Sequence, residues 1–263
     1  MEAGVRWTRG GGLALITGTG RRTGPIEGLI FDIGGTLDAD GRSWAERFRE
    51  LLEAADLPGL TQSAIDAALE AGERAVHHHP RAADLGLEEM VEVHVNAQLD
   101  CLRVVNPLLG ARLRDSFVAA TVATLASRRG LLGRLRERLP LAAVSNGCGN
   151  TRRLLVDCGL DPYFQAIVDS TEAGFWKPDP RIFDPALRSL AASRERVAVV
   201  GDRLDRDVEA ALAAGLCAVW VAGERSVGQA DCRLSGVHAI VRTVEELDPQ
   251  RYEDRERYLQ RGI

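Results

Sequence analysis

The chain has 263 residues, and 45% of them are hydrophobic, which is enough for one sizeable core with a smaller second domain. Its formal net charge of −5 argues against a nucleic-acid partner, because such proteins gather Lys and Arg on one face. No apolar run approaches the roughly 20 residues that cross a bilayer, and no signal-peptide pattern is present, so we expect a cytoplasmic protein without a membrane partner.

Residues 1–26 are rich in Gly, Arg and Thr and show neither helical nor strand periodicity, so we expect a loose N-terminal leader. The stretch 17–24 (TGTGRRTG) imitates a nucleotide-binding loop. Pro25 and Gly28 follow it, however, where a helix would have to begin. We therefore assign no dinucleotide site to it.

An apolar run at 29–31 is typical of a buried strand, and it ends at Asp32 and a pair of glycines. From about residue 43 to 127 the apolar residues recur at helical spacing and no strand is indicated. We therefore place an all-helical insert at 41–126 and give 27–40 to the core domain.

Beyond residue 130, short apolar runs alternate with helical patterns, which predicts βαβ units and a mostly parallel sheet with helices on both faces. The fold class is therefore α/β, with a core made of 27–40 and 127–250 and a C-terminal tail at 251–263. The expected strands of this second part are 141–144, 166–168, 197–200, 217–221 and 239–242.

Polar clusters follow four of the apolar segments, at the strand ends where catalytic groups of α/β proteins gather. A carboxylate nucleophile, groups that hold phosphate oxygens and a carboxylate that holds a hard cation are what phosphoryl transfer requires. The clusters are Asp32 with Gly34, Gly35 and Thr36; Ser145 with Asn146; Lys177; and Asp202 with Asp205 and Asp207.

These clusters resemble, in order and placement, the four motifs of the haloacid dehalogenase superfamily of phosphohydrolases. The matching segments are 31–37 (FDIGGTL), 144–146 (VSN), 177–180 (KPDP) and 201–207 (GDRLDRD). The resemblance implies a Rossmann-like three-layer core, and the insert at 41–126 is similar to the family's first type of cap. It also implies a small phosphorylated metabolite as substrate.

The resemblance further implies roles for single residues. Asp32 would attack phosphorus to give an aspartyl phosphate, and Ser145 and Lys177 would hold the phosphoryl oxygens. Mg²⁺ would be held by Asp32, the Gly34 carbonyl and Asp202, while Asp207 either binds it through water or orients Lys177. Apart from the resemblance, substrate contacts are expected from Gly35, Thr36 and Asn146. Arg42, or Arg47, could meet a second anionic group of the substrate, unless both simply belong to a charged helix start.

Gly34 departs from the family pattern, because hydrolases of this family usually carry there a second aspartate that acts as general acid and base. Losing such a group typically slows a reaction about 10²- to 10⁴-fold. Asp38 and Asp40 are the nearest possible substitutes. A slow or specialised phosphatase is the favoured interpretation, ahead of a non-catalytic binder of a phosphorylated ligand or partner.

A carbon–halogen or carbon–phosphorus hydrolase is the third interpretation. Dehalogenases of the family need no cation and tend to lose the aspartate kept here as Asp202. The phosphonate branch needs a cap lysine, and no Lys occurs between residues 38 and 176.

Other residues that could mark a site have simpler explanations. The run His77 to His79 suggests a metal, but three adjacent histidines cannot all face one ion, so a surface or hinge position is favoured over pocket contact. Trp176 could line a phosphate pocket or cover the sheet edge, and packing over the edge is favoured. The five cysteines include no Cys-x-x-Cys pair, which indicates neither a zinc site nor a disulfide framework.

Overall fold

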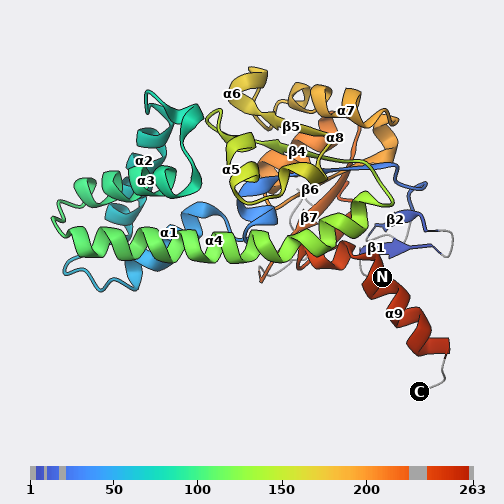
Figure 1. The fold of residues 1–263 in the computed structure, drawn as a ribbon, viewed down its shortest axis with the longest axis horizontal. Coiled ribbons are helices and arrows are strands. Elements are labelled where there is room, and N and C mark those ends of the chain that lie inside the picture. The colour runs from blue at the N-terminus through green and yellow to red at the C-terminus, as the bar shows by residue number, and fades with distance from the viewer. Residues whose placement is uncertain (1–3, 9–10, 18–21, 225–235, 261–263) are drawn as a thin grey trace.

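The computed structural model describes residues 4–8, 11–17, 22–224 and 236–260, with side chains described as far as residue 254. In these residues a six-stranded parallel sheet has the order β5-β4-β3-β6-β7-β8 (Figure 1). The α/β prediction is confirmed. The strands are β3 (Gly28–Phe31), β4 (Leu141–Ser145), β5 (Ala166–Asp169), β6 (Val197–Gly201), β7 (Cys217–Val221) and β8 (Ala239–Val241).

The central strand β3 lies between β4 and β6, so the segment that follows it is flanked by the ends of both neighbours. Phe31 is in register with Ala143 of β4 and Val200 of β6. All three strands run in the same direction, so their carboxyl ends open at one edge of the sheet.

Helices cover both faces of the sheet because side chains along a strand alternate between the faces. Leu29 and Phe31 belong to a buried cluster with α5 and the end of α4, whereas Ile30 belongs to a second cluster with α7 and α8. This gives the expected three layers. The helices of this part are α5 (Thr151–Asp157), α6 (Ser170–Ala173), α7 (Asp184–Leu190) and α8 (Glu209–Ala213), with short turns η3 (Asp161–Tyr163), η4 (Pro180–Phe183), η5 (Arg194–Arg196) and η6 (Leu204–Val208).

Four helices gather beside the sheet around a hydrophobic cluster of their own, as Figure 1 shows on its left. The first begins at a capping box in which Ser43 and Glu46 satisfy each other's backbone groups. We call this helical part the cap. Its helices are α1 (Trp44–Glu53), α2 (Gln62–His77), α3 (Leu87–Cys101) and α4 (Pro107–Arg136), with η2 (Ala82–Asp84) between α2 and α3.

The helix α4 is one continuous element that belongs to both parts of the molecule. Leu113 and Phe117 are buried in the cap cluster, whereas Leu131 and Leu135 are buried against the sheet. The boundary expected at 126/127 therefore lies inside a helix.

A buried arginine fixes α4 where it passes from the cap to the core. Arg128 is 2% exposed, and its guanidinium donates to the Leu37 carbonyl at 3.0 Å and to Asp40 Oδ2 at 2.6 Å. It also forms an ion pair with Glu245. The helix is thus tied to the loop that follows Asp32.

Residues 1–26 are not a loose leader in the part that the structure describes. β1 (Gly4–Trp7) and β2 (Leu13–Ile16) form an antiparallel hairpin, and Trp7, Leu13 and Leu15 are buried in the core. Trp7 Nε1 donates to the Leu247 carbonyl at 2.9 Å. Strands of four residues are too short to give a clear period, which explains the wrong expectation. Residues 18–21 of the loop-like stretch lie outside the described residues.

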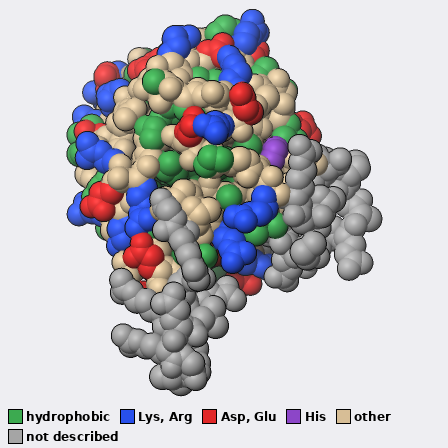
Figure 2. Space-filling model, turned by 90° about the vertical axis from the view of Figure 1, so that its right-hand side faces the viewer, with side chains coloured by type: hydrophobic (Ala, Val, Ile, Leu, Met, Phe, Trp, Pro, Cys, Tyr) green, Lys and Arg blue, Asp and Glu red, His purple; other side chains and the backbone are tan. Residues whose placement is uncertain are grey.

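The chain ends in a helix where we expected a tail. After η8 (Val244–Leu247), α9 (Pro249–Gln260) extends away from the sheet in Figure 1, and residues 261–263 lie outside the described part. Figure 2 shows this end of the molecule, where acidic and basic side chains are interspersed. Among the described residues, no helix is both long enough and apolar enough to cross a membrane.

Candidate active site

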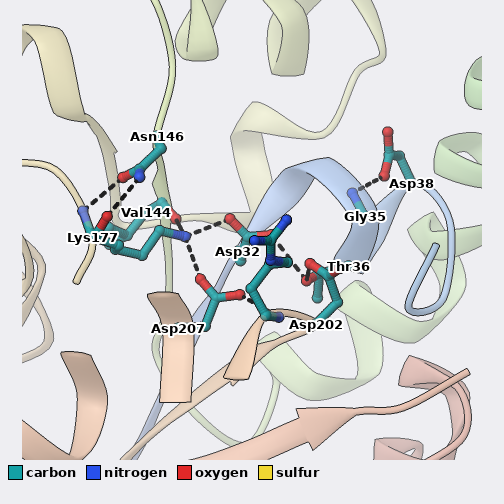
Figure 3. A network of polar contacts seen from close by, with 10 residues as sticks. Asp32, Gly35, Thr36, Asp38, Val144, Asn146, Lys177, Asp202 and Asp207 are labelled. Carbon is teal, nitrogen blue, oxygen red and sulfur yellow. Dashed lines mark hydrogen bonds and ion pairs between the residues drawn. The ribbon is translucent and has the colours of Figure 1, made fainter. Parts of the chain in front are cut away.

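Three strand ends bring polar side chains together at the middle of the sheet. Asp32 follows β3, Asn146 follows β4 and Asp202 follows β6. Asp32 lies between the other two because β3 is the central strand of the three (Figure 3). Asp32 and Asp202 are buried, with 7% and 0% of their surface exposed.

Lys177 reaches this point from the loop after α6. Its Nζ lies 2.5 Å from Asp32 Oδ1 and 2.6 Å from Asp207 Oδ1, and it also donates to the Val144 carbonyl at 3.2 Å (Figure 3). Burial alone would lower the pKa of Lys177, but Asp207 and Asp32 together raise it above the ordinary lysine value. The site therefore contains a fixed positive charge.

Asn146 holds the backbone of that lysine. Its side-chain oxygen accepts from the Lys177 N–H at 2.8 Å, and its amide nitrogen donates to the Lys177 carbonyl at 3.0 Å. We expected Asn146 to contact substrate. It lines the cavity, but its amide is engaged with Lys177, so in this structure it positions the lysine.

Asp32 is held on its second oxygen by Thr36, whose hydroxyl lies 2.9 Å from Asp32 Oδ2 and 3.3 Å from Asp202 Oδ1. Burial raises the pKa of Asp32 from 3.8 to about 6, against the lowering effect of Lys177 and with a further increase from Asp207. The loss of solvation on burial thus outweighs the effect of the neighbouring ammonium group on the pKa of Asp32.

Three buried carboxylates converge closely enough to share a cation. Asp32, Asp202 and Asp207 each offer an oxygen, and these oxygens lie within 4.8 Å of one another. Oxygen ligands of this kind suit Mg²⁺. The donor set therefore fits a hard divalent cation.

Gly35 leaves the space that this cluster needs. Its φ is +91°, and a Cβ at this position would lie 2.8 Å from both oxygens of Asp202. Any side chain at residue 35 would displace that carboxylate. Gly35 and Thr36 do not line the cavity, and they act from beneath the site rather than on a substrate.

Gly34, by contrast, has an ordinary backbone conformation, with φ of −75° and ψ of 114°. A Cβ there would meet only Trp44, at 3.5 Å from its Nε1, which is normal van der Waals contact. Sterics therefore do not require glycine at this position, and the missing aspartate is not a consequence of the fold.

Asp38 does not replace the missing acid. Its Oδ1 accepts from the Gly35 N–H at 2.6 Å, and its Oδ2 accepts from Trp44 Nε1 at 2.6 Å and from Arg47 at 3.1 Å. Burial raises the pKa of Asp38, although Arg47 opposes this. Figure 3 shows its carboxylate turned away from Asp32.

Asp40 is likewise committed to structure. One of its oxygens pairs with Arg128 at 2.6 Å, and the other accepts from the Val244 N–H at 3.0 Å. Neither Asp38 nor Asp40 lines the cavity above Asp32, so neither of these two candidates is placed to substitute for the missing acid.

A cavity of about 690 Å³ lies above Asp32, between the core and the cap. The core contributes its charged floor, and the cap contributes a largely apolar wall. The lining residues are Asp32, Ile33, Gly34, Ser145, Asn146, Gly147, Cys148, Asn150, Thr151, Leu154, Trp176, Lys177, Pro178, Arg203, Arg206 and Asp207 from the core, and Ser43, Trp44, Ala45, Leu69, Glu73, Val76, His77, Met90 and His94 from the cap.

Two other expectations about this cavity were wrong. Arg42 does not reach it, because its guanidinium pairs with Glu50 at 3.0 Å and is half exposed. Trp176 is 49% exposed and lines the cavity instead of packing over the sheet edge.

Several lining residues were not predicted. Glu73 lies one helical turn before His77 on α2, and Arg203 and Arg206 follow β6. The spacing of Glu73 and His77 by four residues on an amphipathic helix was an available signal. It does not reveal by itself that this side of α2 faces the core.

The segment after α2 is docked on the loop that follows β4. Asn150 Nδ2 donates to the Leu85 carbonyl at 3.0 Å and lies 3.3 Å from Met90 Sδ, and Cys148 Sγ lies 3.9 Å from the Ala82 carbonyl. Asn150 is 2% exposed. These contacts fix one end of the cap above the site.

Comparison with known proteins agrees with this geometry. The family model of the haloacid dehalogenase-like hydrolases matches residues 26–215, which is more than half of the chain. A phosphoserine phosphatase of Thermus thermophilus is 42% identical over 87 residues, which are 33% of this chain and 35% of that relative. The chain thus matches only about a third of that protein's length.

A longer match and a solved structure complete the comparison. A glyceraldehyde 3-phosphate phosphatase of Methanopyrus kandleri is 28% identical over 214 residues, covering 74% of this chain and 84% of the relative. An L-2-haloacid dehalogenase of Xanthobacter autotrophicus has a TM-score of 0.51 at 16% identity and covers 84% of this chain and 96% of its own, which shows a shared fold. The chain belongs to the haloacid dehalogenase-like hydrolases.

Proposed function

We propose that this hydrolase is a Mg²⁺-dependent phosphatase for a small phosphorylated metabolite, with Asp32 as the nucleophile. The observation that carries the proposal is the ammonium group of Lys177, held 2.5 Å from Asp32 and 2.6 Å from Asp207 at the cavity floor. A fixed positive charge beside a buried carboxylate suits a phosphoryl group, whose charge lies on its oxygens.

The chain's own residues supply the steps. Asp32 would form a bond to phosphorus, and Lys177 would stabilise the phosphoryl oxygens together with Ser145, which lines the same cavity. Asn146 keeps Lys177 in place through two hydrogen bonds. Mg²⁺ would be held by Asp32, Asp202, Asp207 and the Gly34 carbonyl, and it would supply positive charge against the phosphoryl oxygens.

The size of the cavity and its closure by the cap favour a small substrate. A volume of about 690 Å³ is within the range of sites for small molecules. The two relatives described above carry the names of phosphatases for phosphoserine and for glyceraldehyde 3-phosphate. Arg203 and Arg206 at the wall favour a ligand with anionic groups.

The test is phosphate release from a panel of small phosphate esters with Mg²⁺, measured for the natural chain and for Asp32→Asn. We expect activity in the natural chain and a loss of at least about 10³-fold in Asp32→Asn, because amide nitrogen cannot form the acyl phosphate. Asp115→Asn is the control. Asp115 lies on α4 away from the cavity, and its exposed carboxylate pairs with Arg114 at 2.8 Å.

The alternatives give different results in the same assay. Activity that survives Asp32→Asn contradicts the nucleophile assignment. Ligand binding by the natural chain without any phosphate release indicates a non-catalytic binder. Halide release from a short haloacid in the absence of Mg²⁺ indicates a dehalogenase.

A further inference from the structure

The proposed reaction needs a proton donor for the leaving group, and position 34 has none. Any other donor has to line the cavity above Asp32. Among the described residues, the titratable side chains that do so are Asp32, Glu73, His77, His94, Cys148, Lys177, Arg203, Arg206 and Asp207.

The core members of this set are engaged elsewhere. Asp207 uses one oxygen for Lys177 and the other for the Arg203 N–H at 2.9 Å, and Lys177 is held charged between two carboxylates. Guanidinium groups do not lose their protons in proteins, which excludes Arg203 and Arg206. Burial raises the pKa of Cys148, and its Sγ lies 3.1 Å from Asn150 Oδ1.

Of the cap members, His94 is buried at 6% exposure and stacks on Phe48, and burial lowers its pKa to about 4. It is therefore neutral near pH 7 and has no proton to give to a leaving group. Glu73 and His77 remain. They lie one turn apart on α2, on the side that lines the cavity.

His77 is the better donor of the two by its chemistry. A carboxylic acid has usually lost its proton well below pH 7, whereas an imidazole gains and loses one near neutrality. Glu73 is therefore the weaker candidate of the two.

The end of α2 that carries His77 is the docked end of the cap. His77 is the last residue of α2, and the carbonyls of Ala82 and Leu85 shortly after it contact Cys148 and Asn150 of the core. Those two residues follow β4, which also carries Ser145. His77 thus lies a few residues before the docked segment and lines the same cavity as Ser145.

We propose that His77 of the cap is the general acid and base that position 34 lacks. The inference rests on the proposed phosphatase function. As Asp32 bonds to phosphorus, the ester P–O bond breaks and the leaving oxygen takes the proton of His77. Neutral His77 then takes a proton from a water molecule while the oxygen of that water attacks phosphorus. The aspartyl oxygen–phosphorus bond breaks, Asp32 is restored, and phosphate leaves.

The test compares two esters of nearly the same shape, phenyl phosphate and 4-nitrophenyl phosphate. Only the phenyl ester has a leaving group basic enough to need a proton. For His77→Gln we expect kcat/KM, which reports the transfer to Asp32, to fall about 10²-fold with phenyl phosphate and less than about 10-fold with the nitrophenyl ester. Phosphoenzyme should accumulate in the variant with the nitrophenyl ester, because the base for its hydrolysis is missing.

His78→Gln is the matched control, since His78 is the next residue, does not line the cavity and lies 2.8 Å from the Arg74 carbonyl through Nδ1. It should retain the activity of the natural chain on both esters. Adding Gly34→Asp to His77→Gln should restore the phenyl phosphate activity, because a Cβ is accommodated at position 34.

Two kinds of failure can be told apart. If His77→Gln lowers both esters equally or neither, while Asp32→Asn is inactive, the role of His77 is overturned and the phosphatase proposal stands. If the natural chain hydrolyses neither ester nor any member of the wider panel, the phosphatase proposal fails, and the role of His77 fails with it.

Discussion

Gly34 and Gly35 are neighbours in the chain but have different requirements. Gly35 has positive φ and abuts Asp202, so a side chain would displace a carboxylate of the cluster. Gly34 has an ordinary conformation and room for a Cβ. Gly35 is thus required by the geometry of the site. Gly34 is not, but it affects the chemistry of the site because it carries no acidic side chain.

His94 should make the stability of the protein depend on pH. Burial lowers its pKa from 6.5 to about 4, so between these values the unfolded chain holds a proton that the folded chain does not. The free energy of unfolding should therefore fall as the pH drops from 6.5 to 4, by about 1.4 kcal/mol per unit for this one group. His94→Phe should remove roughly 2 to 3 kcal/mol of that fall.

The measurement is urea unfolding of the natural chain and the variant at several pH values from 7 to 4. Carboxylates contribute to both curves and cancel in the difference. His78→Gln serves as the control and should follow the natural chain. Parallel curves for the natural chain and His94→Phe would contradict the assignment.

At the scale of elements, the helices α2 and α3 pack very closely where Gly72 of α2 faces His94 of α3. A Cβ on Gly72 of α2 would lie 2.2 Å from His94 Nδ1 of α3. Glycine in a helix interior is normally destabilising by about 1 kcal/mol relative to alanine. Here it allows the two cap helices to approach with a buried histidine between them.

Gly72→Ala and Gly133→Ala should therefore shift stability in opposite directions. Gly72→Ala should push α2 and α3 apart and lower the free energy of unfolding by about 1 to 3 kcal/mol. Gly133 lies in α4, where a Cβ would meet only the Tyr163 ring at 3.8 Å, so Gly133→Ala should raise it by about 0.5 to 1 kcal/mol. Thermal unfolding of both variants measures these changes. Tm shifts of the same sign would contradict the role of Gly72 in the close approach of α2 and α3.

At the scale of the whole molecule, a cation in the carboxylate cluster should stabilise the folded chain. Mg²⁺ at about 100 times its Kd should add about 2.7 kcal/mol, which is roughly 5 to 10 °C in Tm. Thermal unfolding with Mg²⁺ and with EDTA measures the shift. Asp202→Asn should abolish it and Asp205→Asn should keep it. Equal Tm values for the natural chain in both buffers would contradict the metal site.

The parts of the molecule that the sequence predicted are those with local signals. Each sheet strand is an apolar run, and Asp32, Asn146 and Asp202 follow such runs directly, so parallel topology alone brings them together. Lys177 was identified by its motif. Its pairing with Asp207 was one of the two alternatives expected for that residue, whereas its pairing with Asp32 follows from a contact over a long sequence distance, which a linear pattern does not encode.

The parts that were missed depend on packing. The hairpin of β1 and β2 is held by the burial of Trp7 and Leu13 against distant residues. The partners of Arg42, Asp38 and Asp40 depend on the path of the loop that follows Asp32. The side of α2 that faces the cavity is set by the docking of residues 82–85, far along the chain from the strand ends.

The unbroken helix α4 also connects the cap to the loop that follows Asp32. At 1.5 Å per residue its 30 residues span about 45 Å, and Arg128 donates to the carbonyl of Leu37, the residue next to Thr36. Only the other crossing, at residues 38–43, is a loop. A movement of the cap that tilted α4 would therefore also shift the loop that follows Asp32.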